Sequence, residues 1–300
     1  MLNFHKLFRW AGLLFLGLVV VMLLVSLFKK NIYNSKLGIN LLLIAKDGAG
    51  IVSIRPETGL VTYLRLPDNL SIPVELNAAE YQIEAIYKIG LPLSNPTDVA
   101  RVSIGQALGV VLGGVVKTNL NFGVPSVREA MLSLATKTNL GFVDRYYLFK
   151  DLSELILKKT TLSLSLPKNV MDQIDEPDGK KISKLNSTVF VWSKNQWLVD
   201  EVLSETAEVA LVNASGTEGK ARQVSRQIES AGIRVIDLLV SKKELKQSCL
   251  MFGSTKAHPI TVDFLINSFK CKLATSKDNV SDYLERDIKS DVVVILGKGT

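Results

Sequence analysis

The run that decides the fold is Ile39–Ala45, which reads INLLLIA. It holds a single polar side chain, and a near-continuous apolar run of this length is typical of a strand buried on both faces of a sheet. Further strands are predicted at 51–54 and 60–66, after turns at Gly48-Ala49-Gly50 and at Pro56-Glu57-Thr58-Gly59. The run therefore opens a mixed sheet that begins with hairpins.

Helical patterns follow the hairpins. We expect a helix over 78–89 that ends at a left-handed Gly90, one that starts at Pro96 behind the cap Asn95, one behind a capping box at Ser126-Val127-Arg128-Glu129, and one over 144–159. Alternating polarity over 161–166 predicts a strand that completes a first domain, residues 38–166.

Residues 167–205 are predicted to be a linker region. Its segment 175–181, DEPDGKK, reads as a solvated turn, because it lacks the alternate carboxylates of a calcium loop. A strand is predicted at 188–192, and Trp192 and Trp197 are predicted to be packing residues.

Residues 206–300 alternate strands with helices and form a second predicted domain. Strands are expected at 209–212, 233–240, 248–252, 271–274 and 292–296, and helices at 219–231, 259–269 and 278–287. The fold class is therefore α/β, with mixed α+β sandwich domains.

An apolar stretch precedes both domains. Residues 11–28 contain no charge, and as a helix they extend about 27 Å, close to the thickness of the hydrocarbon layer. Lys29 and Lys30 end the stretch, and no small-x-small cleavage site follows it, which argues against a signal peptide. We expect a single transmembrane helix within residues 1–30. The flanking charges leave its orientation open.

The net charge of +7 suggests a nucleic-acid binder at first sight. Four of the basic residues flank the apolar stretch, however, and residues 31–300 carry 32 basic and 29 acidic side chains. A net charge of +3 gives little attraction for phosphate backbones, so nucleic acid is an improbable partner.

Few residues are available for metal or nucleophilic chemistry. The chain has two cysteines and two histidines, and it lacks the G-x-S-x-G, H-E-x-x-H, C-x-x-C and P-loop patterns. We expect no metal site at His258. Cys249 and Cys271 each fall in a predicted strand, and both small core residues and a disulfide between neighbouring strands remain open.

One turn suggests a binding motif. Residues 213–221, NASGTEGKA, pass from a strand into a helix through Gly216 and Gly219. We expect a structural turn in which Gly219 allows the helix to approach the strand closely, so that Gly219→Val would overpack it. The alternative is an anion site built from backbone N–H groups.

That turn, with 228–235 (IESAGIRV) and 291–297 (DVVVILG), resembles the LytR C-terminal domain. Residues 40–47 (NLLLIAKD) and 54–68 (IRPETGLVTYLRLPD) resemble the opening strands of a LytR-CpsA-Psr (LCP) domain, which that domain usually follows on a single-pass anchor. The resemblance implies a bacterial cell-envelope protein whose large part lies outside the membrane.

The resemblance also implies a chemistry. LCP domains transfer glycopolymers from a polyprenyl pyrophosphate to peptidoglycan, with arginines and acidic partners that hold the pyrophosphate and Mg²⁺. The candidates carried over are Asp47 and Arg65, with Mg²⁺ as cofactor if the site is active. The Arg-x-Asp expected after Asp47 is missing, and Asp68 stands where the pattern has an arginine. The alternative for Arg65, and the expectation for Arg55 and Arg101, is a solvated surface residue.

Three functions follow from these observations. The first is a glycopolymer transferase of LCP type, the second a non-catalytic envelope binding or scaffold protein, and the third a DNA-binding regulator. The family resemblance favours the first, the missing arginines favour the second, and the charge balance disfavours the third.

The resemblance predicts that residues 31–300 lie outside the cytoplasmic membrane and residues 1–9 inside. Protease added to intact spheroplasts is then expected to digest the large domain and leave a small anchor fragment. Full protection of the domain would reverse the orientation.

Overall fold

The computed structural model describes residues 31–300 apart from 75–78, 94, 159, 178, 195, 254, 276–277, 285–287 and 299–300, together with isolated positions before residue 31. Most of the predicted anchor, residues 11–28, lies outside the described residues. Among those described, no helix is both long and apolar enough to span a bilayer. The anchor therefore stays a prediction.

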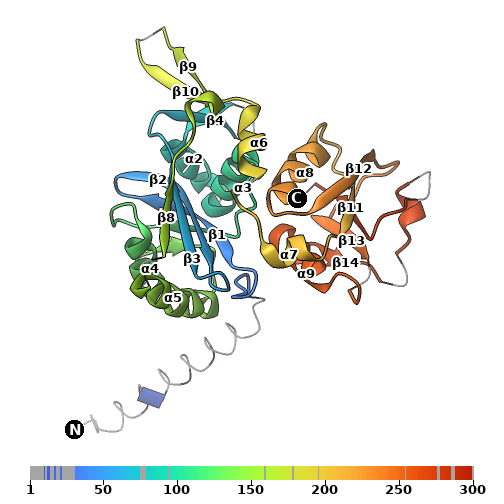
Figure 1. The fold of residues 1–300 in the computed structure, drawn as a ribbon, viewed down its shortest axis with the longest axis horizontal. Helices are drawn as coiled ribbons and strands as arrows, with labels where there is room; N and C mark the ends of the chain where they lie inside the picture. Colours follow the sequence, from blue (N-terminus) through green and yellow to red (C-terminus); the bar gives the residue numbers. More distant parts are fainter. Residues whose placement is uncertain are drawn as a thin grey trace.

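The predicted first strand is the third strand of a six-stranded sheet ordered β7-β6-β1-β2-β3-β8 (Figure 1). The strands are β1 (Ile39–Ala45), β2 (Gly48–Arg55), β3 (Leu60–Arg65), β6 (Gly114–Lys117), β7 (Lys137–Thr138) and β8 (Thr161–Leu164). β1 pairs antiparallel with β2 and parallel with β6. The predictions at 39–45 and 60–66 are confirmed, whereas Gly48-Ala49-Gly50 belongs to β2 rather than to a turn.

Helices cover both faces of this sheet, which explains the continuous apolar run of β1. Leu42 and Ile44 pack with α2 (Ile83–Ile89) and α3 (Pro96–Leu108), whereas Leu41 and Leu43 pack with α4 (Val124–Leu132) and α5 (Phe142–Leu157). Successive side chains of a strand point to opposite faces, so each face needs its own apolar set.

Some details of the predicted helix ends are wrong, although α2 ends at Ile89 as predicted. Residues 80–82 form strand β5 (Glu80–Gln82) before α2, and Gly90 has a right-handed conformation with φ −73°. Residues 126–129 lie inside α4, which starts at Val124 without a side-chain cap. α3 starts at Pro96 as predicted, but the Asn95 side chain donates to Oδ2 of Asp98 (2.7 Å) rather than capping the backbone.

The predicted linker contributes to a second sheet, ordered β5-β4-β10-β9. β9 (Met171–Asp175) and β10 (Lys181–Leu185) form a hairpin that projects from the molecule, and β10 pairs with β4 (Leu70–Pro73) (Figure 1). The strand predicted at 188–192 is wrong, because these residues form helix α6 (Thr188–Lys194). Trp197 is buried and meets Trp192 edge to face, as the prediction of packing residues requires.

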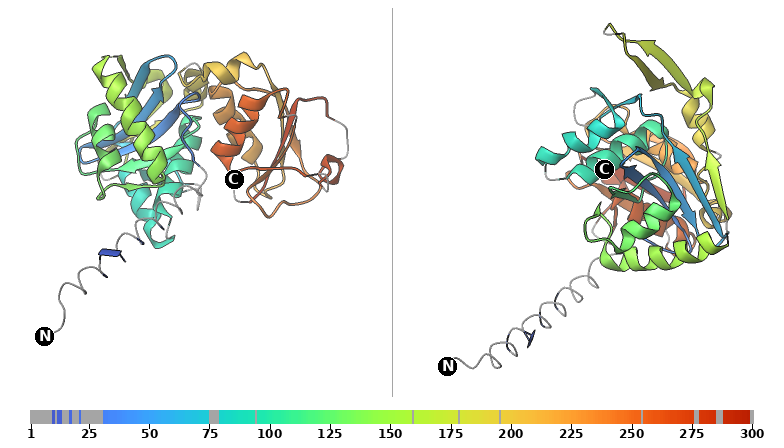
Figure 2. Two further views of the ribbon diagram at one scale, coloured as in Figure 1. Left: turned by 90° about the horizontal axis from the view of Figure 1, so that it is seen from below. Right: turned by 90° about the vertical axis from the view of Figure 1, so that its left-hand side faces the viewer.

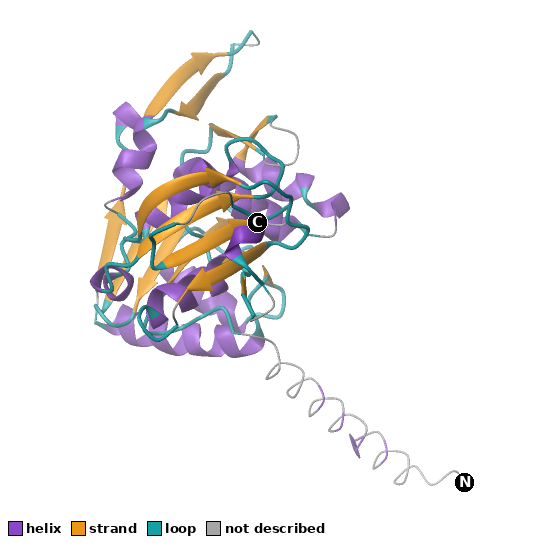
Figure 3. Cartoon of the chain, turned by 90° about the vertical axis from the view of Figure 1, so that its right-hand side faces the viewer, coloured by secondary structure: helices purple, strands orange, loops and turns teal. Residues whose placement is uncertain are grey.

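A five-stranded sheet, ordered β12-β11-β15-β13-β14, lies in the C-terminal part (Figure 3). Its strands are β11 (Glu208–Asn213), β12 (Arg234–Val240), β13 (Cys249–Gly253), β14 (Lys272–Leu273) and β15 (Val292–Leu296). Helices α8 (Lys220–Ser230) and α9 (Pro259–Phe269) cover one face, and Tyr283 and Leu284 pack on the other. Among the described residues of the predicted helix 278–287, only a 3-10 turn, Val280–Asp282, forms.

The two parts meet along a seam. Leu37 packs into the C-terminal core, and the buried Gln227 side chain of α8 donates to the carbonyl of Val110 (3.1 Å). Arg226 stacks on Phe190, with 3.9 Å between the guanidinium carbon and the ring centroid.

Cys249 and Cys271 form a disulfide with a Cα–Cα distance of 4.5 Å. The parallel pairing of β13 with β14 brings them together, because Leu250 is opposite Lys272 in the register. Of the two readings left open by the sequence, the structure selects the disulfide.

Reduction of this disulfide is expected to destabilise the chain by about 3 kcal/mol, because the bond closes a loop of sequence separation 22. Urea unfolding with and without reductant measures the change, and alkylation followed by intact mass counts the thiols. Two alkylated cysteines in the unreduced protein would contradict the bond.

Candidate functional site

The ends of three strands lie at one edge of the six-stranded sheet. β1, β3 and β6 point the same way, because β3 is antiparallel to β2, β2 is antiparallel to β1, and β6 is parallel to β1. Their carboxyl ends therefore bring Asp47, Arg65 and Lys117 to this edge, which we call the sheet rim.

The sequence candidates Asp47 and Arg65 are in contact there. An Nη1–Oδ2 distance of 3.6 Å joins the two side chains, and Nη2 of Arg65 also donates to the main-chain carbonyl of Asp47. The other carboxylate oxygen of Asp47 accepts the backbone N–H of Phe122 (2.5 Å), and the Phe122 ring lies 5.8 Å from the Arg65 guanidinium carbon. Both charged side chains are more than a third exposed.

Asp68 borders the same group. A Cβ added to Gly48 would lie 3.0 Å from Nη2 of Arg65 and 3.2 Å from Oδ1 of Asp68, so both side chains lie over this glycine. Gly48 has φ +144°, which also disfavours a side chain. Asp47, Arg65 and Asp68 together carry a net charge of −1.

A second cationic group lies on the rim. Nζ of Lys117 lies 4.1 Å from the centroid of the Tyr87 ring, a cation–π contact between β6 and α2. Burial and then the charge of Lys88 lower the pKa of Lys117, whereas Glu84 opposes them. Burial raises the pKa of Tyr87.

The donors on the rim do not fit Mg²⁺. One oxygen of Asp47 accepts the Phe122 N–H and the other faces Arg65. In the described part of the chain, no three His, Cys, Asp or Glu side chains gather as metal ligands would. We therefore derive no step through a metal.

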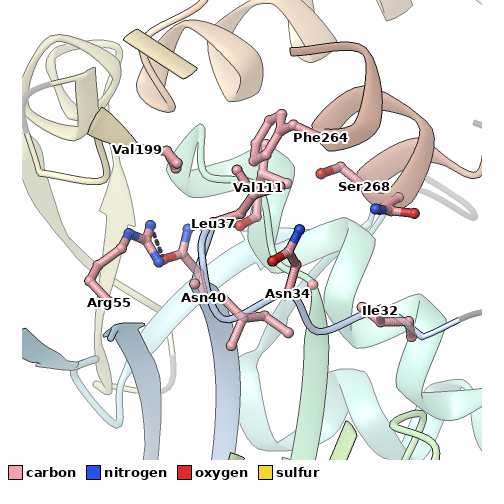
Figure 4. A pocket seen from close by; sticks show the side chains of 13 residues that line it. Ile32, Asn34, Leu37, Asn40, Arg55, Val111, Val199, Phe264 and Ser268 are labelled. Carbon is pink, nitrogen blue, oxygen red and sulfur yellow. Dashed lines mark hydrogen bonds between the residues drawn. The ribbon is translucent and has the colours of Figure 1, made fainter. Parts of the chain in front are cut away.

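Arg55 lies at the seam and is not a solvated residue as predicted. Its Nη2 donates to Oδ1 of Asn40 (2.9 Å) in a cavity of about 40 Å³, where Val199 and Phe264 of the C-terminal part also lie (Figure 4). Burial lowers the pKa of Arg55 to about 10, against the charges of Glu201 and Asp200. This arginine lies at the seam, bonded to Asn40 and to the carbonyl of Ile54, and away from Asp47 and Arg65.

Arg101 is also largely buried, contrary to the prediction. Its Nε lies 3.3 Å from Oδ1 of Asp98, and its Nη1 donates to the carbonyl of Leu112 (3.2 Å). Lys270 reaches Asp98 from the C-terminal part (3.4 Å). Burial alone would raise the pKa of Asp98, but the Asn95 hydrogen bond and the charges of Arg101 and Lys270 outweigh it and lower the pKa. These three charged residues border a seam cavity of about 510 Å³.

The turn 213–221 is held by its own side chains. Asn213 donates to the carbonyl of Thr217 (2.8 Å), and Ser215 donates to Oδ1 of Asn213 (2.7 Å). A Cβ on Gly216 would meet a Glu244 carboxylate oxygen at 2.7 Å, and this negative charge disfavours the alternative of an anion site. The turn is structural.

The predicted reason for Gly219 is wrong. No atom lies within 4 Å of a Cβ added there, so a side chain would not overpack the helix. Gly219 is needed because its φ is +77°, in the left-handed region just before α8.

His258 lies at the start of α9, with Nε2 3.5 Å from Oδ1 of Asp291. Among the described residues, it belongs to no group of three His, Cys, Asp or Glu side chains that could hold a metal ion.

Sequence reasoning missed Phe122, Lys117 and Tyr87. Phe122 lies in the loop after β6, and nothing local marks it as a partner of Asp47. Lys117 could have been found from its position. It ends β6, whose parallel neighbour β1 leads into Asp47, and the carboxyl ends of parallel strands gather at one edge of a sheet.

Asn40→Ala is expected to destabilise the chain by about 3 kcal/mol, because it leaves Nη2 of the buried Arg55 guanidinium without its acceptor and the Val111 carbonyl without its donor. Asp47→Ala, which breaks an exposed pair, is expected to cost about 1 kcal/mol or less. Urea unfolding of the full chain in detergent micelles measures both. Equal losses of stability in Asn40→Ala and Asp47→Ala would contradict the assignment of Arg55 to the buried seam and of Arg65 to the exposed rim.

Gly219→Ala is expected to cost about 1 kcal/mol through backbone strain, and Gly219→Asn less, because asparagine tolerates the left-handed region better. If overpacking were the cause, Gly219→Asn would cost more stability than Gly219→Ala, because asparagine is larger. The same unfolding measurement decides between the two explanations.

No protein-family profile matches the chain, and no curated protein matches its sequence. Among solved structures, TagT of Bacillus subtilis is 15% identical with a TM-score of 0.39, over 53% of this chain and 89% of TagT. TagV of Bacillus subtilis is 10% identical with a TM-score of 0.40, over 52% of this chain and 94% of TagV.

A structure of the LytR-CPS2A-psr family protein YwtF (TagT) with bound octaprenyl pyrophosphate lipid is 15% identical with a TM-score of 0.38, over 55% of this chain and 90% of that one. Function has to be argued from this chain's own residues. Over about half its length, the chain is similar in structure to LytR-CPS2A-psr proteins.

Proposed function

We propose that the chain is a single-pass membrane protein of the bacterial cell envelope that binds envelope glycans, lipid-linked or in peptidoglycan, without transferring phosphate. The observation that carries the proposal is the group of Asp47, Arg65 and Asp68 on the sheet rim, in which the one arginine is already paired. The class of ligand comes from the sequence resemblance.

The charges of this group oppose pyrophosphate binding. Phosphoryl transfer depends on cations that stabilise the charge on the transferred group, and guanidinium groups do so through paired hydrogen bonds. Arg65 directs one nitrogen to the carboxylate of Asp47 and another to its carbonyl. Asp68 adds a negative charge beside it. A pyrophosphate placed here would displace an ion pair and approach two carboxylates.

The rim retains groups that suit glycan binding. Tyr87 is buried in the core, and its ring supports Lys117, which brings a positive charge near Lys88. Ammonium groups can bind an acidic substituent of a glycan as point charges, without chemistry at it.

The proposed location rests on two features. Residues 11–28 are long enough to span a bilayer, and the Cys249–Cys271 disulfide suits an oxidising compartment outside the cytoplasm. The large part would then face the envelope.

A glycopolymer transferase is the second candidate. It is favoured by Asp47, a carboxylate at the strand end to which the resemblance assigns the active site, held in place by the Phe122 N–H. Turnover of a lipid-pyrophosphate donor separates the two candidates.

We expect the full chain, mixed with a polyprenyl-pyrophosphate glycan and Mg²⁺, to show no phosphate-bond cleavage above a buffer control. Asp68→Arg is expected to tighten binding of that lipid on the order of tenfold. Two unit charges about 6 Å apart in water interact by about 0.7 kcal/mol. The variant changes the charge by two units and a pyrophosphate diester carries two, so the change is about 2.8 kcal/mol, which salt screening reduces to roughly 1.4 kcal/mol, or tenfold. Binding is measured by titration of the lipid in detergent micelles.

Asp175→Arg, which makes the same charge change on the projecting hairpin, is the matched control and is expected to leave binding unchanged. Turnover by the wild-type chain comparable to that of an LCP enzyme would overturn the non-catalytic assignment. If Asp68→Arg and Asp175→Arg changed binding of the lipid equally, the rim would not be part of the binding site.

A further inference from the structure

The outer face of α5 exposes a stripe of large apolar side chains. Phe142, Tyr146 and Leu157 are each more than half exposed. With Lys150 and Ser153 between them, they follow spacings of three and four residues, which places them along one side of the helix. We call this surface the α5 stripe.

Exposed aromatic side chains are concentrated on this helix. Among the described residues after residue 31, the aromatic side chains that are at least half exposed are Phe142, Tyr146 and Tyr147. Leu132 ends α4, and the almost fully exposed Leu134 lies in the loop that follows. The Arg145 side chain ties this segment to α5 through the carbonyls of Met131 and Ser133. Such a patch indicates an interaction surface.

The chain that follows the predicted anchor is fastened to the same helix. The backbone N–H groups of Ile32 and Tyr33 both donate to Oδ1 of Asp144 (3.0 Å each), and the Tyr33 hydroxyl donates to Oδ2 of Asp151 (2.6 Å). Figures 1 and 2 show α5 along the border of the molecule where the described chain begins.

The length of the connection limits how far α5 can lie from a membrane. Four residue steps separate Phe28, the end of the apolar stretch, from Ile32. An extended chain covers at most about 14 Å in four steps, whereas the headgroup layer beyond the hydrocarbon is about 6 Å thick. Ile32, whose N–H is bonded to Asp144 in the first turn of α5, is therefore held no more than about 8 Å beyond the headgroup layer.

We propose that the α5 stripe docks on the lipid headgroups of the membrane that holds the anchor, so that the domain lies against the bilayer rather than free above it. The inference rests on the anchor of the proposed function. Tyrosine rings favour the headgroup layer, where the ring is half buried and the hydroxyl stays hydrated. Lys150 extends from the same stripe, and its charge suits anionic headgroups.

The test uses the full chain in vesicles of phosphatidylcholine and phosphatidylglycerol that contain a nickel-chelating lipid. A nitroxide on Lys150→Cys is expected to show strong relaxation by the nickel, and one on Val240→Cys, on the exposed edge strand β12 of the other part, is expected to show little. Flotation of the vesicles reports anchoring independently.

Replacing Phe142, Tyr146 and Leu157 together by serine is expected to abolish the relaxation at position 150 while the protein still floats. The matched control replaces Ile236, Leu238 and Val240, three exposed apolar residues of β12, by serine and is expected to retain it. Floating protein with equally weak relaxation at both labels would overturn the docked stripe and leave the anchor intact. Protein that does not float would overturn both.

Discussion

The burial of β1 on both faces is the constraint on which the N-terminal part depends. Leu42 and Ile44 serve one core, and Leu41 and Leu43 serve the other, so a register shift by one residue would exchange the two sets. This strand also sets the direction of its neighbours, antiparallel for β2 and parallel for β6. The gathering of Asp47, Arg65 and Lys117 at one edge is a consequence of that pairing.

The two residues carried over from the sequence resemblance, Asp47 and Arg65, lie together on the sheet rim and are paired with each other. A site for pyrophosphate needs cations whose hydrogen-bond donors are available to the ligand. Here the carbonyl and carboxylate of Asp47 occupy Arg65, and Asp68 lies on the other side of Gly48. The remaining positive charge comes from lysine, which binds as a point charge without the fork geometry of arginine. These features together favour recognition over transfer.

Neither Arg55 nor Arg101 supplies a guanidinium group to the rim. Arg55 satisfies Asn40 at the seam, and Arg101 satisfies Asp98 and the Leu112 carbonyl. Lys270 joins Asp98 across the seam, and Gln227 reaches the Val110 carbonyl. Buried polar groups are costly to leave unpaired. The contacts of Lys270 and Gln227 across the seam therefore hold the two parts in one relative position.

Local patterns in the sequence were sufficient for elements whose signal is strong and short in range. The apolar run of β1, the Pro96 start of α3 and the alternation of strands and helices after residue 206 could all be read from neighbouring residues. Residues 188–192 could not, because a short apolar run suits a strand or a helix equally, and packing of Val189 into the core decided for a helix. Asp47 and Arg65 were chosen through a resemblance, whereas their contact follows from long-range strand pairing. The burial of Arg55 and Arg101, the partner Phe122 and the conformational role of Gly219 depend on residues distant in the chain or on backbone angles, and only tertiary structure determines these.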